Sequence, residues 1–319
     1  MTDFSLQGYS SDRLVLVVGA ANLDMIGILN QPLQQGTPNP ANIRVAFGGV
    51  GRNVAENLAR LGQPVRLITA VGNDLSGEQL LSYTAACSVE VQGCVKSDVH
   101  DTGCYLAVLS EDGSRFMTLE DMEVLTELTP EYLLRSQESF AQAAILFTDA
   151  NLSPDALETL FRQAREARLP VCADTASTLL AERLLPYLDQ VYMLTANRTE
   201  ASKLCQNNPV VDDRDTALQA ARLLVNRGVD LVVISLGEGG VVYATSETSG
   251  HVPAARVSVL DPTGAGDALT ATIIFGLLND IPIDEAVRLG VTAASLILRY
   301  RGTVFPGLSL EKLYDELVT

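Results

Sequence analysis

A short stretch late in the chain, LDPTGAGDALTA (260–271), places two glycines and two aspartates between apolar runs. The flanking patterns predict a strand over 256–260 and an apolar helix over 267–278, so the glycines lie in the turn between them. The first amides of a helix have no partner within it, and small residues let an anion approach them closely. We therefore predict an anion hole formed by Gly264, Ala265 and Gly266.

Asp267 follows this predicted anion hole directly. If the hole holds a phosphoryl group in transfer, a carboxylate at this position can accept the proton of the attacking hydroxyl. The alternative is a first-turn acid that only stabilises the helix. Two other phosphate-binding patterns are missing. The turn lacks the third glycine of the dinucleotide fingerprint, and none of the three lysines follows a glycine as a P-loop requires.

Two clusters early in the chain are candidates for binding a sugar. Asn22 and Asp24 follow a predicted strand over 14–21, and open α/β sheets bind ligands at the carboxyl ends of their strands. The alternative for this pair is an ordinary Asx turn. The second cluster, FGGVGRN (47–53), lies at the start of a predicted helix over 52–62. Gly48 and Gly49 permit close approach of the backbone to a ligand, and the side-chain amide of Asn53 suits sugar hydroxyls.

Two later clusters suit a nucleotide and its metal ion. Asn197 and Glu200 stand three apart at a strand end, so they share a helical face and are candidates to hold hydrated Mg²⁺ near phosphates, or alternatively to cap that helix. SLGEGG (235–240) ends another strand, and its candidate nucleotide contacts are Ser235, Gly237, Gly239 and Gly240. The alternative for this segment is a tight turn. Because all five clusters follow predicted strands, we favour ligand binding over isolated turns.

The elements that position these residues alternate along the chain. Buried strands such as 143–150 precede helices such as 155–169, whose start is marked by Ser153 and Pro154. This alternation predicts a single α/β domain over residues 1–319, with a doubly wound, mostly parallel sheet covered by helices on both faces. Segments at approximately 26–47 and 99–121 are rich in strands and turns instead. They predict a small β-sheet lid, or alternatively an edge insertion without that role.

Composition excludes several classes of function. The 319 residues are 47% hydrophobic, and 39 acidic against 22 basic residues give a formal charge of −17. A chain of this size and hydrophobicity can bury a large core, and its charge argues against binding nucleic acid or an anionic membrane. We predict a cytoplasmic protein from three features of the sequence. The start is polar, no apolar run reaches about 18 residues, and the five cysteines lack the spacing of a disulfide framework or a zinc site.

GGVGRNVAENLARLG (48–62) and DPTGAGD (261–267) resemble the two signatures of the ribokinase-like (PfkB) carbohydrate kinases. The resemblance extends from the first strand to the last helix. It implies transfer of the γ-phosphoryl group of ATP to a sugar hydroxyl, with Asp267 as the base and the glycine turn as the anion hole. It also implies that the sugar is held by Asn22, Asp24, Gly48, Gly49 and Asn53.

The same resemblance assigns the cofactors. Asn197 and Glu200 match an Asn-x-x-Glu motif associated with Mg²⁺ and phosphate, and SLGEGG aligns with a nucleotide-binding turn. Three residues resemble a site for a monovalent cation such as K⁺: Asp261, Thr263 and Gly302. The expected cofactors are therefore ATP and Mg²⁺, with K⁺ as a further candidate.

The acceptor is indicated by a departure from the family pattern. Where sugar kinases of this family often have a glutamate, the sequence reads FTDAN, which makes Asp149 and Asn151 candidate acceptor contacts and is compatible with a nucleoside. The Gly-Arg-Asn at 51–53 and DTGCYLAVL (101–109) resemble a subfamily that phosphorylates the 5′-hydroxyl of pseudouridine. Ribose, an ordinary nucleoside, or sugar binding without catalysis are the alternatives.

The lid carries two further expectations. Thr102 and Asp121 bracket the predicted hairpin and are candidates to contact the base of a nucleoside. Exposed strands of a small sheet pair readily with a second copy, so a homodimer through the lid is expected.

Overall fold

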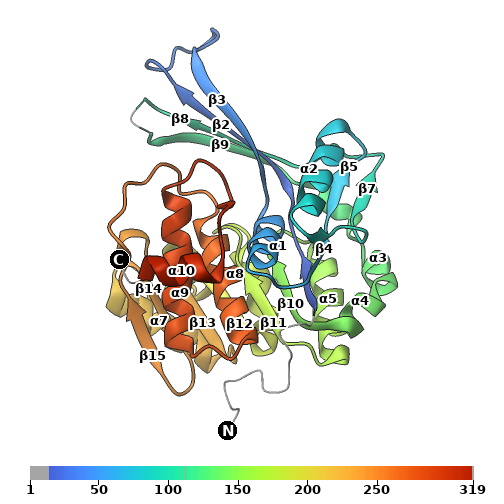
Figure 1. Cartoon of the computed structure of the whole chain (residues 1–319), viewed down its shortest axis with the longest axis vertical. Helices are drawn as coiled ribbons and strands as arrows, with labels where there is room; N and C mark the ends of the chain where they lie inside the picture. Colours follow the sequence, from blue (N-terminus) through green and yellow to red (C-terminus); the bar gives the residue numbers. More distant parts are fainter. Residues whose placement is uncertain (1–13, 112, 318–319) are drawn as a thin grey trace.

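The computed structural model describes residues 14–111 and 113–317, and its largest element is a nine-stranded sheet (Figure 1). Its order is β15-β14-β13-β12-β11-β10-β1-β4-β6. Neighbouring strands run parallel, except that β14 is antiparallel to β13 and β15. The strands are β1 (Leu14–Val18), β4 (Val65–Ile68), β6 (Val89–Glu90), β10 (Ala143–Asp149), β11 (Val171–Asp174), β12 (Met193–Asn197), β13 (Leu231–Ser235), β14 (Val241–Ala244) and β15 (Ser249–Val252).

Helices cover both faces of this sheet because alternate strand residues point to opposite sides. In β1, Leu16 and Val18 join one apolar core, while Val15 and Val17 join the other. The first core contains α3 (Pro130–Arg135), α4 (Gln137–Gln142), α5 (Pro154–Ala167), α6 (Arg198–Leu204), α7 (Arg214–Asn226) and the 3-10 segments η1 (Glu123–Glu127) and η2 (Ala181–Gln190). The second contains α1 (Val50–Arg60), α8 (Ala265–Leu278), α9 (Ile283–Leu298) and α10 (Leu310–Leu317). The predicted doubly wound sheet is confirmed.

The strand order reverses direction beside β1. Chain order runs outward from β1 through β4 and β6 on one side, and through β10 to β13 on the other. The loops that follow β1 and β10 therefore diverge, and a crevice opens at the carboxyl edge of the sheet, where open α/β sheets bind ligands.

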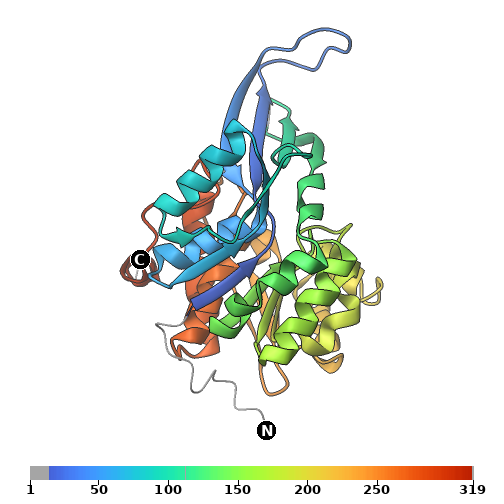
Figure 2. The same cartoon turned by 90° about the vertical axis from the view of Figure 1, so that its right-hand side faces the viewer.

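A separate four-stranded sheet, the lid sheet, projects from the main body above this crevice (Figures 1 and 2). Its order is β3-β2-β8-β9, with antiparallel pairs β2/β3 and β8/β9 joined by a parallel β2/β8 pair. The strands are β2 (Asn22–Leu29), β3 (Ala41–Gly48), β8 (Cys104–Leu109) and β9 (Arg115–Asp121). The small sheet predicted from the two irregular segments is confirmed. Asp112, in the predicted turn, lies outside the described residues.

The remaining elements lie outside these two sheets. Strands β5 (Ala70–Gly72) and β7 (Val95–Ser97) form a two-stranded parallel sheet, and α2 (Leu75–Ala86) packs beside it. A short 3-10 turn, η3 (Gly237–Gly239), follows β13. Within the described part of the chain, no helix combines the length and apolar character needed to span a membrane.

One predicted strand is wrong. Residues 256–260 are irregular, and Val259 and Leu260 are exposed. After β15 the chain leaves the edge of the sheet and runs to the end of α9, where the Leu260 amide donates to the Leu298 carbonyl at 2.7 Å. The predicted helix after the glycine turn is confirmed as α8, which is buried along almost its whole length. The turn is thus held by α8 and α9 instead of by a strand.

Candidate active site

Three cavities lie in a row along the crevice and share lining residues. The lid pocket, about 230 Å³, is lined by Ala20, Asn22, Asp24, Gly49, Val50, Asn53, Tyr105, Glu120, Met122, Asn151, Ala176, Ser177, Thr263 and Asp267. The central pocket, about 250 Å³, is lined by Val50, Asp174, Ala176, Thr195, Ala196, Asn197, Glu200, Val233, Ser235, Gly266, Asp267, Leu269 and Thr270. The helix pocket, about 510 Å³, includes Asn197, Ser235, Gly237, Gly240, Ala265, Gly266 and Leu269. Asp267 lines the first two pockets and Gly266 the last two.

The start of α8 lies between these pockets with its first amides uncapped by any side chain in the described structure. Gly264, the residue before the helix, has φ 83° and packs so closely that an added Cβ would lie 1.9 Å from the carbonyl oxygen of Thr303. Gly266 differs, because a Cβ there would meet no protein atom within 4 Å. One glycine is therefore required by the fold, while the other leaves space in the pocket. This geometry suits an anion at the amide of Gly266, and the amide of Ala265 beside it makes only a long backbone hydrogen bond of 3.4 Å to the Pro262 carbonyl.

Asp267 is held by Asn53 and has the properties of a base near neutral pH. The Asn53 side-chain nitrogen donates to Oδ2 of Asp267 at 2.6 Å. Burial, with smaller contributions from the carboxylates of Asp24 and Asp149, raises the pKa of Asp267 to about 7 against the opposing effect of the hydrogen bond from Asn53. A carboxylate with such a pKa accepts a proton more readily than one near 4 and is still largely ionised at slightly alkaline pH.

Arg52 orients the amide that holds Asp267. Its guanidinium donates to Oδ1 of Asn53. Since this oxygen accepts from Arg52, the nitrogen of the same amide must face Asp267, where it donates its hydrogen bond. Sequence reasoning noted Arg52 only as part of a motif and assigned it no role.

The other contacts of Arg52 connect three distant segments. Its side chain is fully buried and pairs with Glu56 at 2.5 Å. It donates to the carbonyls of Phe47 and Gly48 at the end of β3, at 2.8 and 3.0 Å. It also donates to the hydroxyl of Thr303 at 2.9 Å, and the carbonyl of this residue packs against the glycine turn. Arg52 therefore joins the lid sheet, α1 and the segment that packs against the glycine turn through one buried cation.

The lid pocket is lined by four of the five residues predicted to hold a sugar, all except Gly48. The Asn22 amide donates to Oδ1 of Asp24 at 2.7 Å, and burial raises the pKa of Asp24 to about 6. Gly48 leaves room for this carboxylate, since a Cβ there would lie 2.4 Å from it. Gly49, at φ 94°, packs against the carbonyl of Ala20. Its role is thus to let α1 approach the end of β1.

Seven lining residues of the lid pocket were missed, among them Tyr105, Glu120, Met122 and Ser177. Tyr105 is the cross-strand partner of Asp24 in β2 and of Glu120 in β9. Cross-strand partners share one face of a sheet, so these three side chains belong to the face that covers the pocket. Pairing the alternate residues of the predicted lid strands would have identified Tyr105 and Glu120.

The other candidate acceptor residues lie in different places. Asn151 lines the lid pocket, whereas Asp149 is fully buried and accepts the Ala20 amide at 2.8 Å and the Asn151 side chain at 2.8 Å. Thr102 is buried below the lid sheet, where its hydroxyl donates to Asp74 at 2.8 Å. Asp121 is exposed and its carboxylate accepts the Glu123 amide at 3.1 Å. Of these four side chains, only Asn151 lines the lid pocket.

The central pocket is bordered by carboxylates. Glu200 is buried and closes a capping box with Asn197, whose side-chain nitrogen donates to it at 2.6 Å. Burial, together with the carboxylates of Glu200 and Asp267, raises the pKa of Asp174 to about 8. In the described part of the chain, no three acidic, histidine or cysteine side chains are close enough to hold a metal ion alone. These residues fit a hydrated Mg²⁺ that takes its other ligands from phosphates and water.

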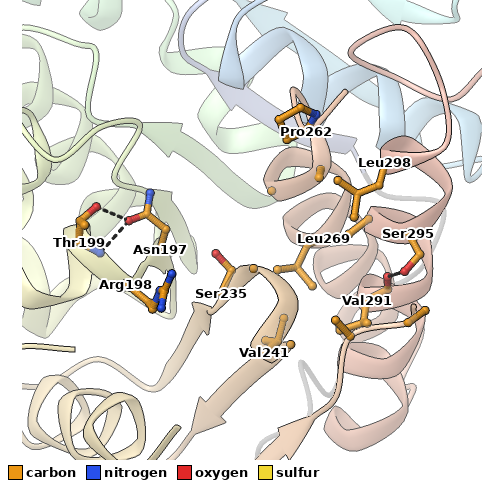
Figure 3. A pocket seen from close by; sticks show the side chains of 17 residues that line it. Asn197, Arg198, Thr199, Ser235, Val241, Pro262, Leu269, Val291, Ser295 and Leu298 are labelled. Atoms are coloured by element: carbon orange, nitrogen blue, oxygen red, sulfur yellow. Dashed lines mark hydrogen bonds between the residues drawn. The ribbon is translucent and has the colours of Figure 1, made fainter. Parts of the chain in front are cut away.

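The helix pocket has one polar wall and one apolar wall (Figure 3). Asn197 and Ser235 lie on the strand side, where β12 and β13 end. Leu269, Val291 and Leu298 lie on the side of α8 and α9. Gly237 and Gly240 line this pocket as expected for the SLGEGG turn, while the carbonyl of Gly239 bonds to the His251 ring at 2.7 Å. An apolar slot beside helix amides suits an aromatic ring joined to phosphates.

The predicted monovalent-cation residues are arranged differently from a free cation site. The carboxylate of Asp261 is paired with the guanidinium of Arg44 from the lid sheet, and its other oxygen accepts the Thr263 amide at 3.0 Å. Thr263 lines the lid pocket, and Gly302 lies against the ring of Tyr300.

Comparisons with known proteins identify the family that the chain resembles in sequence and in fold. The family model described as pfkB family carbohydrate kinase matches residues 12–309. The chain is 32% identical to the pseudouridine kinase of Escherichia coli, over 93% of this chain and 94% of that protein. It is 31% identical to the guanosine-inosine kinase of Exiguobacterium acetylicum, over 89% and 94%. Its fold matches an Arabidopsis thaliana ribokinase solved with ribose and ATP, with a TM-score of 0.83, 22% identity and coverage of 97% and 99%.

Proposed function

This chain belongs to the pfkB family of carbohydrate kinases, and from that premise we propose that it phosphorylates the 5′-hydroxyl of pseudouridine with ATP. The observation that carries the proposal is the position of Asp267. Its carboxylate borders both the lid pocket, which bears the sugar-type ligands, and the central pocket at the start of α8. A base at this junction faces an acceptor on one side and a phosphoryl group on the other.

The chemical step follows from this placement. The acceptor hydroxyl in the lid pocket attacks the γ-phosphorus of ATP, and Asp267 accepts the hydroxyl proton as the bond to the leaving ADP oxygen breaks. The amides of Ala265 and Gly266 stabilise the charge on the transferred oxygens. Asn53 holds the carboxylate in place during transfer, and Arg52 holds Asn53.

ATP is proposed to occupy the helix and central pockets. The apolar wall of Leu269, Val291 and Leu298 suits the adenine ring, and the phosphates then point toward Gly266. Bound Mg²⁺ would neutralise charge on the phosphates, and Asn197 and Glu200 would hold its water ligands. All five cysteines are free, as expected of the cytoplasmic location that we also propose.

Pseudouridine is favoured over uridine by the chemistry of the lid pocket. Its base is joined to the sugar through carbon, so the ring keeps an N–H donor that uridine lacks. The pocket offers a carboxylate acceptor in Glu120, beside the aromatic ring of Tyr105 and the thioether of Met122. Asn22 and Asp24 are assigned to the ribose hydroxyls, and Asp149 is assigned the positioning of Asn151 and the end of β1.

A substrate panel tests the proposal. ADP release is measured with pseudouridine, uridine, inosine, guanosine and ribose, with Glu120→Gln as a matched variant. We expect the largest kcat/KM with pseudouridine, and we expect E120Q to lower it by roughly tenfold while changing the value for ribose little. A preference for inosine or guanosine would favour the activity named for the Exiguobacterium relative. Absence of ADP release with every acceptor would favour a binding protein without catalysis.

The lid sheet also supports the proposal of a homodimer. Its face away from the pocket carries exposed apolar side chains on both edge strands: Ile43, Val45, Met117 and Leu119, which are 74%, 56%, 42% and 55% exposed. Exposed apolar side chains gathered on one face of a sheet commonly mark an interface. Sedimentation of the wild type is expected to give a dimer, and the pair Val45→Lys with Leu119→Lys a monomer. A monomeric wild type would refute the dimer.

A further inference from the structure

Arg44 connects the lid sheet to the loop that leads into the anion hole. It lies in β3, where its guanidinium forms an ion pair with the carboxylate of Asp261, 217 residues later in the chain. Asp261 is 5% exposed, and its second oxygen accepts the amide of Thr263. The ion pair therefore fixes the first half of the DPTGAGD turn from the lid side.

A buried carboxylate at this place requires a compensating cation. Asp261 precedes the anion hole by three residues, and an unpaired negative charge there would repel an incoming polyphosphate. The resemblance of the sequence to the family implied that a bound monovalent cation compensates this charge. The guanidinium of Arg44 already contacts the same carboxylate, so a K⁺ ion at Asp261 would meet a like charge. The residues present therefore do not fit a free cation site.

We propose that Arg44 is the cation of this site, a positioning residue that replaces a monovalent ion and fixes the anion-hole loop. The inference rests on the proposed ATP-dependent transfer but not on the identity of the acceptor. Nucleotide binding is therefore independent of K⁺ in this protein, and it depends on the lid sheet being docked over the loop.

The register of the lid sheet extends this role to the acceptor. Arg44 pairs with Ile26 in β2, and Ala46 pairs with Asp24. Alternate residues share a face, so Arg44 projects from the face that bears Asp24 over the lid pocket. The same rigid strand thus contacts the anion-hole loop and borders the acceptor, which links the two substrates through one element.

The test measures binding of a non-hydrolysable ATP analogue by calorimetry, without any acceptor. The buffer is chosen to contain K⁺, Na⁺ or tetramethylammonium at equal ionic strength. Arg44→Gln removes the charge and keeps much of the side-chain length, while Arg44→Lys keeps the charge. Arg214→Gln, which removes an exposed surface guanidinium, is the matched control.

We expect the wild type, R44K and R214Q to bind the analogue equally in all three buffers, within about twofold. R44Q is expected to bind roughly tenfold more weakly in tetramethylammonium and to recover with K⁺ or added guanidinium. A wild type that needs K⁺ would overturn the proposal. An R44Q variant with unchanged affinity, or with a loss that no cation reverses, would also overturn it.

These results separate the inference from the proposed function. Nucleotide binding with the expected cation behaviour supports the role of Arg44 even if the substrate panel gives another acceptor. Failure of the wild type to bind any ATP analogue would instead refute the kinase proposal, and with it the inference.

Discussion

Replacing Asp267 by asparagine should separate catalysis from stability. Asparagine keeps an oxygen that accepts from Asn53, so the local hydrogen bond is retained, while the base is lost. Turnover is therefore expected to fall by roughly 10² to 10⁴, the usual contribution of a general base. Binding of an ATP analogue should stay within about twofold of the wild type, because the anion hole is unchanged.

The same substitution should stabilise the fold. The pKa of Asp267 is raised from 3.8 to about 7, so between these values the folded state binds more protons than the unfolded state. The stability of the wild type therefore falls as pH rises through this window, and the full cost is present above pH 7. A pKa shift of this size corresponds to a loss of roughly 4 kcal/mol in the free energy of unfolding. Because the side chain borders an open pocket, where solvent screens its charge, we expect the loss to be about 2 kcal/mol.

Urea unfolding of the wild type and of Asp267→Asn checks this magnitude. The variant should gain about 2 kcal/mol near pH 8 and less than about 1 kcal/mol near pH 5, because less of the wild-type cost is present there. Asp212→Asn, on an exposed residue before α7, should show neither effect. The wild-type kcat/KM should rise with pH up to about 7 and then level off. A variant that is less stable, or active at wild-type rates, would refute the reasoning.

Four further substitutions test the parts of the site. Gly266→Ala should fold at least as stably as the wild type, since its Cβ meets no protein atom, but it should bind ATP roughly tenfold more weakly by calorimetry. Gly264→Ala should lower the free energy of unfolding by more than about 2 kcal/mol, because its Cβ clashes with the Thr303 carbonyl. Arg52→Met should cost about 2 to 4 kcal/mol in urea unfolding, because it removes the buried cation from one oxygen of Glu56 and the donors to the carbonyls of Phe47 and Gly48, while Arg60 keeps its pair with the other oxygen of Glu56. A loss below about 1 kcal/mol would refute the structural role of Arg52. Glu200→Gln should raise the Mg²⁺ concentration for half-maximal turnover by about tenfold. An unchanged Mg²⁺ concentration would count against the assignment of Glu200 to the metal ion.

Local patterns predicted the parts of the protein that depend on neighbouring residues. Ser153 caps α5 as expected, accepting the Ala156 amide at 3.2 Å, and the glycine turn begins α8. Strand and helix periodicity gave the alternating topology and the position of the lid sheet. Each of these features has a signal in residues that are close together in the chain, although the strands of the lid sheet pair over about 80 residues.

Features that depend on distant contacts were missed. Arg52 bonds to Thr303, 251 residues later, and Arg44 to Asp261, 217 residues later, and neither pairing leaves a local pattern. The predicted strand at 256–260 had suitable β-branched residues, but the chain had already left the sheet edge after β15. Sequence pattern does not tell a strand from an extended segment when the sheet offers no partner.

A crystal structure with pseudouridine and a non-hydrolysable ATP analogue tests the central claim most directly. We predict the 5′-hydroxyl of the nucleoside at about 2.6 to 3.2 Å from a carboxylate oxygen of Asp267, with the terminal phosphate at the amides of Ala265 and Gly266. The claim would be contradicted if Asp267 pointed away from the hydroxyl, or if the phosphate lay elsewhere in the crevice.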